Sequence, residues 1–465
     1  MPAFKLSPEQ ILEPIQQQVT GSIFPKVISG PAATYLAMQY QLNHSQCWSH
    51  EKMREHQFRQ ITQLVQHAYK HVPLYREKFK HLGMHLNGKI DEYVFSHLPI
   101  LKRAELQDNP ENIKSQYIPP EHGKTGNAST SGSTGQPVKI LTTDLSTLMW
   151  RAFTFREHFW FNRDFSKQLA AIRYAPHGTA EIKDNITSKE WGPATNISFN
   201  TGPSSFLNSN VDIKDQAQWL IAQKPEYLMS HPSNIQALAE YFIEHNLHVP
   251  NLVEIRSHGE PVTEKLRHLC QQAWKCKLAD IYSTVEVGYI ALQCPRHDHY
   301  HIQSEGIYVE ILDDNNQPCK PGEIGRVVVT PLHNFGSPLI RYEVGDYAEA
   351  GEQCDCGRTL PVIKRVLGRV RNMVKLPNGG QVWPEFGYAD FDNIKKIKQL
   401  QLIQHKIDAI EAKIVVSSPL TTEEENQLVK IWQRNFHYPF KINFTYVDLI
   451  PRGPSGKFEE FKSAI

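Results

Sequence analysis

A stretch rich in glycine and hydroxyl side chains lies at residues 128–137, which read Ala-Ser-Thr-Ser-Gly-Ser-Thr-Gly-Gln-Pro. Such a stretch exposes backbone N–H groups and hydroxyl donors without bulky side chains between them, as loops that wrap phosphate chains do. No Gly-Lys-[Ser/Thr] follows, so the P-loop of NTPases is excluded. A flexible Gly/Ser linker has the same composition. For a triphosphate loop, the candidate contact residues are Ser131, Gly132, Ser133, Thr134 and Gly135.

Four further motifs follow downstream in a fixed order: Tyr282-Ser283-Thr284-Val285-Glu286, Pro338 to Asp346, Gly368 to Met373 and Gly453-Pro454-Ser455-Gly456-Lys457-Phe458. Together with the Gly/Ser-rich stretch they resemble the adenylate-forming superfamily of acyl-CoA synthetases. The likeness is strongest to its phenylacetate-CoA ligase branch and the related capsule-biosynthesis type. It runs from about Lys70 to the C-terminus, with His71 to Arg76 and Cys354 to Arg358 as marks of the branch.

The resemblance implies an enzyme that activates a carboxylic acid, aryl or acyl, with ATP and Mg²⁺. The acyl adenylate would then pass to a thiol, either coenzyme A or the phosphopantetheine of a carrier protein. Two positions depart from the superfamily pattern, because Ser283 replaces a glycine and Val285 replaces a hydroxyl residue. A non-catalytic scaffold that binds an acyl group or a nucleotide is therefore the alternative from a different functional class.

The resemblance also implies roles for single residues. Lys457 would bridge the substrate carboxylate and the α-phosphate, where an ammonium group stabilises charge during adenylation. Glu286 would bind Mg²⁺, for which one protein carboxylate suffices when phosphates supply other ligands. Tyr282 would line the adenine, and Ser283 and Thr284 would supply the remaining hydroxyl contacts to the α-phosphate.

Asp346 ends a Gly-Asp pair that we expect to form a turn after an apolar strand. An ionised carboxylate offers paired acceptors for two ribose hydroxyls, although aspartate is also common in turns that bind nothing. The resemblance implies that Asp346 binds the ribose and that Arg369 also binds the nucleotide. The resemblance places Arg341 near the nucleotide. The alternative interpretation is that Arg341 is a charged residue at the surface of a strand. Arg371 takes the hinge position, which requires tolerant backbone more than one side chain.

The chain has seven cysteines, an odd number that favours reduced thiols or metal ligands over a disulfide framework. Three thiolates and an imidazole bind Zn²⁺ tetrahedrally. The thiolates would come from Cys294, Cys354 and Cys356, and the resemblance identifies His301 as the imidazole. Four protein ligands leave no open position, so this zinc would be structural; cysteines without metal are the alternative. Two other histidines could compete for the nitrogen position: His297 and His299.

Composition narrows the class of protein further. At 465 residues and 40% hydrophobic content, the chain is long enough for a large domain and a smaller one. A net charge of +1 gives no basic stripe for nucleic acid. No run approaches the roughly 18 apolar residues of a membrane span, and residues 1–5 lack a signal-peptide core. We therefore expect a cytoplasmic protein, and a homodimer is compatible with this composition.

The elements that must position these residues form an expected α/β fold. Residues 51–82 are predicted to be helical until Pro73 interrupts them. Between about 138 and 330, short β-rich runs alternate with helical stretches, as in a sheet flanked by helices. A strand at residues 225–230 precedes a helix that we expect to be capped near Ser233.

The predicted organisation is an N-terminal domain at residues 1–367, a hinge at 368–372 and a small α+β domain at 373–465. The resemblance assigns the acid pocket to three segments before and around the Tyr282 motif, but the sequence does not order their side chains. The segments are Tyr174 to Gly178, Ser230 to Asn234 and His258 to Pro261.

Overall fold

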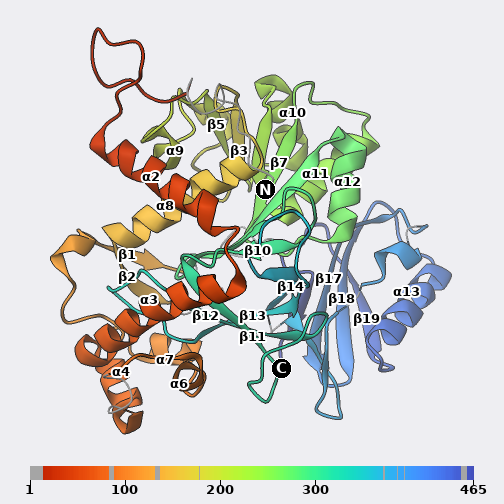
Figure 1. Ribbon diagram of the computed structural model, residues 1–465. Coiled ribbons are helices and arrows are strands. Elements are labelled where there is room, and N and C mark those ends of the chain that lie inside the picture. Colours follow the sequence, from red (N-terminus) through yellow and green to blue (C-terminus); the bar gives the residue numbers. More distant parts are fainter. Residues whose placement is uncertain are drawn as a thin grey trace. The chain divides into compact units, whose positions relative to one another are not determined.

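The computed structural model describes residues 14–82, 88–130, 137–176, 178–369, 372–384, 386–391, 393–451 and 458–465. The chain separates into two compact units, Met1–Val366 and Leu367–Ile465, and each is treated by itself here (Figure 1). Several predicted functional positions lie outside the described residues: Ser131, Gly132, Ser133, Thr134, Gly135, Arg371 and Lys457.

In the described part of the large unit, twelve strands form one mixed sheet. Its order differs strongly from the order of the strands in the chain, so long connections cross the sheet. From one edge to the other the strands are β11 (Ile307–Leu312), β12 (Ile324–Pro331), β13 (Tyr342–Ala350), β14 (Val362–Arg369), β10 (Tyr300–Ile302), β9 (Gly288–Gln293), β8 (Lys277–Thr284), β7 (Glu254–His258), β6 (Tyr227–Ser230), β3 (Leu169–Arg173), β5 (Ser204–Asn208) and β4 (Ile186–Ser188).

Helices precede the sheet and connect its strands. The first ones come from the N-terminal part of the chain, and the later ones are crossovers within the sheet (Figure 1). The α-helices of the large unit are α2 (Gly30–Ser45), α3 (His50–His71), α4 (Pro73–Lys78), α6 (Glu92–Ser96), α7 (Arg103–Asp108), α8 (Asp144–Trp160), α9 (Pro193–Asn196), α10 (Ile213–Gln223), α11 (Pro232–Glu244) and α12 (Glu264–Trp274).

The centre of the sheet is parallel. β3 pairs with β5 and β6 in parallel, and β6, β7 and β8 continue the parallel run. α11 connects β6 to β7 and α12 connects β7 to β8, as parallel neighbours require a crossover. All carboxyl ends of these strands therefore reach the same edge of the sheet, and the predicted α/β fold is confirmed.

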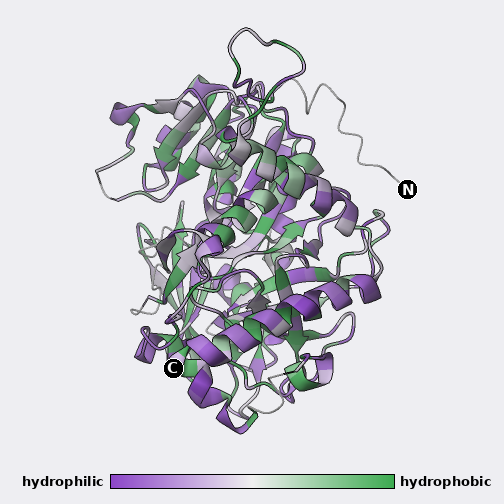
Figure 2. Ribbon diagram, turned by 60° about the vertical axis from the view of Figure 1, so that its left-hand side comes forward, coloured by the Kyte–Doolittle hydropathy of each residue, from purple (hydrophilic) through white to green (hydrophobic). Residues whose placement is uncertain are grey.

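The two faces of the parallel region are covered by different helices. Ile255 on β7 belongs to a buried apolar cluster with α10, α11 and α12, while the next residue, Arg256, reaches Glu157 on α8. Successive side chains of a strand point to opposite faces, so α8 covers the face opposite the crossovers. In Figure 2 the helices alternate between purple and green along their length, as expected of helices with one buried side.

The helix predicted from residue 51 is confirmed by α3. Its buried residues Phe58, Ile61, Leu64 and Val65 recur at helical spacing. The helix ends at His71 and Pro73 begins α4, because proline fits the first turn of a helix but not its interior.

The predicted cap of the next helix is wrong by two residues. His231, not Ser233, is the N-cap of α11. Pro232 occupies the first helical position, so the helix begins two residues earlier than predicted. Ser233 instead donates from its backbone N–H and its hydroxyl to Glu260.

A separate hairpin flanks the Gly/Ser-rich stretch. β1 (Thr125–Ser129) pairs antiparallel with β2 (Lys139–Thr143). Beyond the last pair, Thr130 N–H donates to the Val138 carbonyl at 3.0 Å, and Val138 N–H donates to Thr130 Oγ1 at 2.9 Å. The hairpin is therefore hydrogen-bonded up to the residues on either side of 131–136.

The small unit has its own core. Buried Leu402 and Ile414 from its sheet pack with Leu428 and Trp432 of its helix, so an α+β unit follows the sheet domain. The sheet order is β19 (Lys441–Tyr446), β18 (Ala409–Val416), β17 (Ile397–Lys406) and β20 (Phe461–Ser463); the helix is α13 (Thr422–Asn435), and β15 (Val374–Lys375) pairs with β16 (Gln381–Val382).

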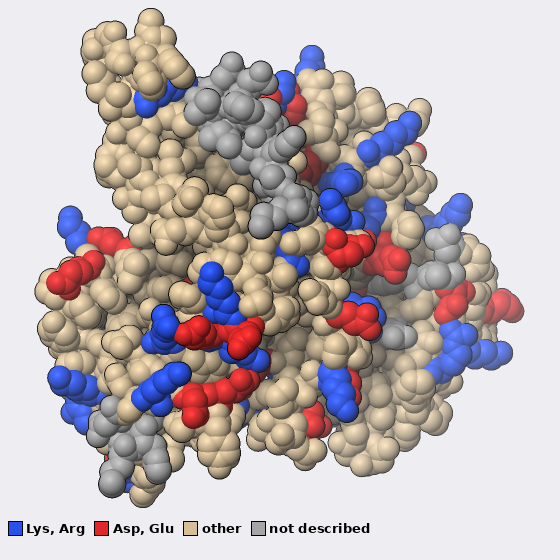
Figure 3. Space-filling model, viewed as in Figure 1, with Lys and Arg blue, Asp and Glu red and all other residues tan. Residues whose placement is uncertain are grey.

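On the face drawn in Figure 3, blue and red side chains are intermixed, without a large patch of one sign. This agrees with the near-zero net charge of the chain. In the described part of the chain, no helix is both long enough and apolar enough to cross a membrane.

A buried ion cluster fixes α8 on the sheet. Glu157 is fully buried and lies 2.6 Å from both Arg163 and Arg256, while Arg163 also lies 2.6 Å from Glu254. Burial alone would raise the pKa of Glu157, but the two guanidinium groups outweigh it and lower the pKa to about 2. The carboxylate is therefore charged in the folded protein at any ordinary pH.

Removing this carboxylate should destabilise the large unit strongly. Glu157→Ala leaves two buried guanidinium groups without their shared partner, which costs about 3–5 kcal/mol of unfolding free energy. Because the folded pKa lies below the ordinary value of 4.5, the wild-type stabilisation is complete above pH about 4.5 and is lost as the pH falls toward 2. Urea unfolding at several pH values measures both effects. Glu55→Ala, on an exposed helical pair with Arg59, is the control and should change little.

Candidate active site

The carboxyl ends of the central strands bring two predicted acid-pocket segments together. The His231 ring, just after β6, lies 4.6 Å between centroids from the His258 ring at the end of β7. His231 Nδ1 is 3.0 Å from the His258 carbonyl oxygen. In open α/β sheets, ligands bind outside the carboxyl ends of the strands. The third segment continues from the end of β3, and His177 within it lies outside the described residues.

Tyr282 and Asp346 meet at this edge. The Tyr282 hydroxyl donates to Asp346 Oδ2 at 3.0 Å, and both side chains are more than nine-tenths buried. The predicted turn at Asp346 is wrong, because Asp346 lies inside β13. Arg326 pairs with Tyr347 and Val328 with Glu343, so β13 bulges between them. Gly345 has a φ of +87° in this bulge, a conformation that favours glycine.

Glu286 lies in the turn between β8 and β9 and is also buried. Its Oε1 accepts from Arg103 Nη1 at 3.1 Å and from the Tyr342 hydroxyl at 3.3 Å. Within the described part of the chain, no hydrogen bond or ion pair reaches Oε2. One oxygen is thus held in place and the other can form a coordination bond, so the carboxylate fits the single ligand that a nucleotide-bound Mg²⁺ needs.

Tyr342 stays protonated beside this carboxylate. Burial raises the pKa of its phenol well above the usual value, and the negative charge of Glu286 raises it further. The hydroxyl therefore remains a donor to Glu286 throughout the physiological pH range. Ordered hydrogen bonds of this kind orient the carboxylates that bind metals.

The other residues of the Tyr282 motif line the same turn. Ser283 and Thr284 are partly exposed, and Val285 is 52% exposed. Thr284 Oγ1 accepts from the Val287 N–H at 3.3 Å, so its hydroxyl hydrogen remains available to donate. An exposed valine between Thr284 and buried Glu286 supplies no hydrogen bond from its side chain.

Arg341 is buried, so the surface-charge alternative is wrong. Its guanidinium makes a two-pronged ion pair with Glu310, at 2.9 and 3.0 Å, and also donates to backbone carbonyls of Ser96 and Leu98. With a φ of +50° it holds a rare backbone conformation. Its side chain ties the segment before α7 to the sheet. Arg369 is the last residue of β14.

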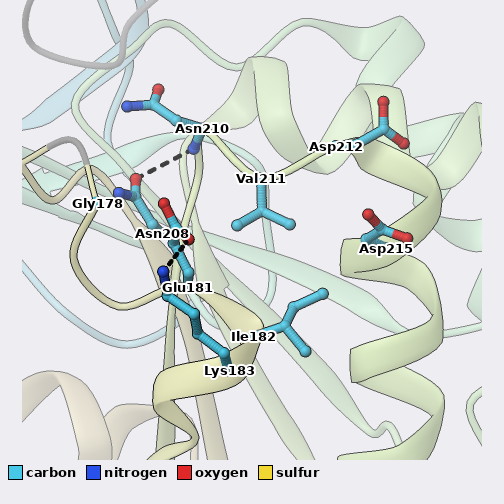
Figure 4. A pocket seen from close by; sticks show the side chains of 9 residues that line it. All are labelled: Gly178, Glu181, Ile182, Lys183, Asn208, Asn210, Val211, Asp212 and Asp215. Carbon is cyan, nitrogen blue, oxygen red and sulfur yellow. Dashed lines mark hydrogen bonds and ion pairs between the residues drawn. The ribbon is translucent and has the colours of Figure 1, made fainter.

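A cavity of about 330 Å³ opens near the carboxyl end of β5, beside Gly178 of the predicted acid pocket (Figure 4). Its lining carries the carboxylates of Glu181, Asp212 and Asp215, against one ammonium group, Lys183, which pairs with Glu181 at 3.3 Å. Excess negative charge disfavours a carboxylate substrate. The acid pocket is therefore better sought at the His231 and His258 edge.

The cysteines predicted to bind metal converge. Cys294 follows β9, while Cys354 and Cys356 lie between β13 and β14. Cys294 Sγ is 3.9 Å from Cys354 Sγ, and Cys356 Sγ is 3.3 Å from His301 Nε2. A zinc tetrahedron has ligand-to-ligand distances of roughly 3.3–3.8 Å, from Zn–S and Zn–N bonds of about 2.3 and 2.0 Å. The Cys356–His301 distance falls within this range, and the Cys294–Cys354 distance lies just above it.

Polar contacts act on the three thiols in different directions. Hydrogen bonds from the Cys294 thiol and then from His301 lower the pKa of Cys356 far below that of an ordinary thiol, which favours a thiolate there. The hydrogen bond with Cys356 raises the pKa of Cys294, and burial raises the pKa of Cys354. Cys356 N–H donates to Cys354 Sγ at 3.3 Å, and His301 Nδ1 is 3.3 Å from the Leu360 carbonyl oxygen. That carbonyl fixes the tautomer and leaves Nε2 for the metal.

The structure also brings His299 into the cluster. One donor atom from each of Cys294, His299, His301 and Cys354 lies within 4.8 Å of all the others. In the described residues, His299 Nε2 is buried without a hydrogen-bond partner. Burial lowers the pKa of His299 to about 4, so its ring is neutral and able to coordinate. The other competitor, His297, instead lies 2.6 Å from Asp355.

Comparison with known proteins agrees with this architecture. Residues 376–464 match the CapK C-terminal domain family. The chain is 25% identical to the phenylacetate-coenzyme A ligase of Pseudomonas putida, over 75% of the chain and 77% of that protein. It is 22% identical to protein CapK of Staphylococcus aureus, over 80% of the chain and 81% of that protein.

Comparison with solved structures shows which fold this chain has. A 2-hydroxyisobutyryl-CoA ligase with a bound acyl-AMP matches with a TM-score of 0.71 and 17% identity, covering 90% of each chain. The chain has the fold of the adenylate-forming CoA ligases. An anthranilate CoA ligase bound to anthranoyl-AMP matches less closely, with a TM-score of 0.53 over 72% of this chain and 65% of that one. The resemblance predicted from the motifs is thus confirmed.

Three residues of this site were not predicted: Arg103, Tyr342 and Thr130. Tyr342 lies within the Pro338 to Asp346 motif, but a tyrosine in a strand gives no sign that it faces a carboxylate. Arg103 begins the short helix α7, 183 residues before its partner Glu286. No local pattern distinguishes it from a surface arginine.

Proposed function

We propose that this protein is an AMP-forming acid–thiol ligase that activates a carboxylic acid and transfers the acyl group to a thiol. The observation that carries the proposal is the convergence of Tyr282, Asp346 and Glu286 at the carboxyl edge of the central strands. Support comes from relatives named phenylacetate-coenzyme A ligase, which match three quarters of the chain or more.

The reaction has two steps. In the first, a carboxylate oxygen of the acid attacks the α-phosphorus of ATP, the bond to the β-phosphate bridging oxygen breaks, and pyrophosphate leaves. In the second, a thiol sulfur loses its proton to solvent and attacks the acyl carbon, and AMP leaves. In the first step negative charge lies on the oxygens of the α-phosphate and on the leaving pyrophosphate, so the step depends on positive charge and on fixed donors.

The residues at the sheet edge bind the nucleotide in this proposal. Asp346 accepts hydrogen bonds from the ribose hydroxyls, and the Tyr282 ring lines the adenine. Glu286 Oε2 is the protein ligand of Mg²⁺, which when bound neutralises phosphate charge. Arg369 is a further nucleotide-binding residue of this proposal. The phosphate contacts come from Ser131, Gly132, Ser133, Thr134, Gly135, Ser283 and Thr284.

Two elements from the C-terminal part of the chain complete the scheme. Lys457 supplies the ammonium group between the substrate carboxylate and the α-phosphate. Residues 368–372 serve as the hinge about which the C-terminal domain, 373–465, changes position between the two steps. Gly368 has a φ of +104°, so its backbone already adopts a conformation that other residues avoid.

Coenzyme A is the proposed thiol. Two of the curated relatives are named as coenzyme A ligases. A carrier protein is the second candidate, because residues 376–464 match a domain of the capsule-biosynthesis type. We place the activity in the cytoplasm, where ATP, Mg²⁺ and reduced thiols are available.

We further propose a structural zinc held by Cys294, His301, Cys354 and Cys356, with His299 as the competing nitrogen donor. The metal would connect the turn between β9 and β10 to the segment between β13 and β14. It has no open position for substrate, so it takes no part in either chemical step.

ATP–pyrophosphate exchange with a panel of aryl and aliphatic acids tests the function. Exchange with at least one acid is expected, because adenylation is reversible. Lys457→Ala should lower exchange by about 100-fold or more, as for other residues that stabilise transition-state charge. The same variant should still convert a pre-made acyl adenylate to a thioester with coenzyme A. A folded protein that exchanges with no acid supports the non-catalytic scaffold instead.

Asp346→Asn should raise the KM for ATP by about 10-fold or more, because hydrogen bonds to charged groups contribute about 1.5–3 kcal/mol. The kcat should change less, since a ribose contact is present before and during the reaction. Tyr282→Phe is the matched control: it removes the hydroxyl that donates to Asp346 and leaves the carboxylate. An equal KM increase in both variants would mean that Asp346 only holds Tyr282.

Protein purified without added metal should contain about one zinc per chain by elemental analysis. Cys354→Ser/Cys356→Ser should lose the zinc and unfold at a lower temperature. Cys319→Ser, which changes a cysteine outside the cluster, should keep both. Zinc-free wild-type protein of full stability would contradict the proposed site.

A further inference from the structure

Arg103 joins two parts of the proposed site that lie far apart in the sequence. Its Nη1 donates to Glu286 Oε1 at 3.1 Å and to the Tyr342 hydroxyl oxygen at 3.4 Å. Its Nη2 donates to Thr130 Oγ1 at 3.1 Å. The Arg103 side chain is 19% exposed and that of Glu286 is 3% exposed, so the pair is shielded from most of the solvent.

Thr130 lies in the Gly/Ser-rich stretch and is the last described residue before 131–136. Its Oγ1 accepts from both Arg103 and the Val138 N–H, so both lone pairs of the hydroxyl are occupied. Thr130 N–H also donates to the Val138 carbonyl. The end of β1 is therefore fixed by hydrogen bonds on two sides, one of them from the same guanidinium that holds Glu286.

From this geometry we infer that Arg103 is a positioning residue for the Mg²⁺-bound nucleotide. It holds Glu286 by one oxygen so that the other faces the metal, and it sets the distance between that carboxylate and the base of the Gly/Ser-rich hairpin. The inference rests on the proposed function, which supplies the nucleotide.

The residue type suits this role. A guanidinium presents two separate NH₂ groups in a rigid plane, so one side chain can bridge two acceptors at a fixed separation. A lysine keeps the charge but donates from a single nitrogen on a flexible stem. Arg103→Lys therefore retains a cation for Glu286 while breaking the bridge to Thr130 or loosening the hold on Oε1.

A different result is expected if the ion pair between Arg103 and Glu286 is purely structural. The pair would then stabilise the fold, and the effect of losing it on ATP binding would be the same with and without Mg²⁺. A positioning role instead links Arg103 to the gain in ATP affinity that Mg²⁺ provides. That gain can be measured by binding alone, without turnover.

The experiment is calorimetric titration of the full-length protein with ATP, with and without Mg²⁺. Mg²⁺ should strengthen ATP binding by the wild type. In Arg103→Lys this strengthening should fall by about 10-fold or more, whereas affinity for metal-free ATP should change by less than about 3-fold. In the Glu286→Gln background, Arg103→Lys should have no further effect on the Mg²⁺ dependence, because the residue acts through Glu286.

Arg54→Lys is the matched control. Arg54 on α3 also contacts a tyrosine hydroxyl, that of Tyr308 at 2.6 Å, and a carboxylate, Glu92 at 3.2 Å. It should keep the full Mg²⁺ effect. If thermal unfolding shows Arg103→Lys to be misfolded, Tyr342→Phe removes the other contact on Oε1 by deleting one hydroxyl and should reduce the Mg²⁺ effect in the same direction.

Two results would overturn the inference. An unchanged Mg²⁺ effect in a folded Arg103→Lys variant would reduce Arg103 to a structural ion pair and leave the proposed function intact. An equal loss in the wild-type and Glu286→Gln backgrounds would show that Arg103 does not act through the carboxylate. A wild type that binds no ATP in either condition would refute the proposed function, and the inference with it.

Discussion

The burial of one carboxylate, Glu286, constrains much of the large unit. A charged carboxylate withdrawn from water costs several kcal/mol unless a cation and hydrogen bonds compensate it. Here the compensation comes from Arg103 and Tyr342. These residues belong to α7 and β13, and Arg103 also fixes Thr130 beside β1. The hairpin, the short helix and the sheet therefore have to meet at one place before Glu286 can be buried.

This arrangement holds Glu286 through Oε1, which accepts from Arg103 and from Tyr342. A carboxylate that is anchored by one oxygen keeps its orientation without a ligand, so binding requires less rearrangement. Such preorganisation lowers the entropy that must be lost when a nucleotide or a metal binds.

The sequence allowed the fold class and much of the candidate site to be predicted, because both depend on local patterns. Alternating strands and helices indicate an α/β sheet, and α3, with its apolar spacing, was predicted almost to its end. The sequence did not predict which residue pairs with each charged side chain. The surface position considered for Arg341 was wrong, because Glu310 and two carbonyls hold its side chain in the interior.

A smaller error has the same origin. Asp346 was placed in a turn because Gly-Asp is common there, but pairing with β12 keeps the chain extended through a bulge. The candidate metal ligands, His299 among them, were predicted from residue types, whereas the approach of their donor atoms depends on the turn between β9 and β10. Distant segments of the chain determine where strands bulge, where turns form and which side chains pair. These features therefore cannot be predicted from neighbouring residues alone.

The order of strands in the large sheet bears on how the protein is made. β14 lies between β13 and β10, although it is the last strand of this sheet to be synthesised. Until residues 362–369 leave the ribosome, β10 lacks the neighbour with which Tyr300 and His301 pair, and β13 is also open on that side. The nascent chain thus carries two unfinished sheet edges, which are sites of aggregation. The strand that closes them runs across the boundary to the small unit, so the sheet can be completed only as translation of that unit begins.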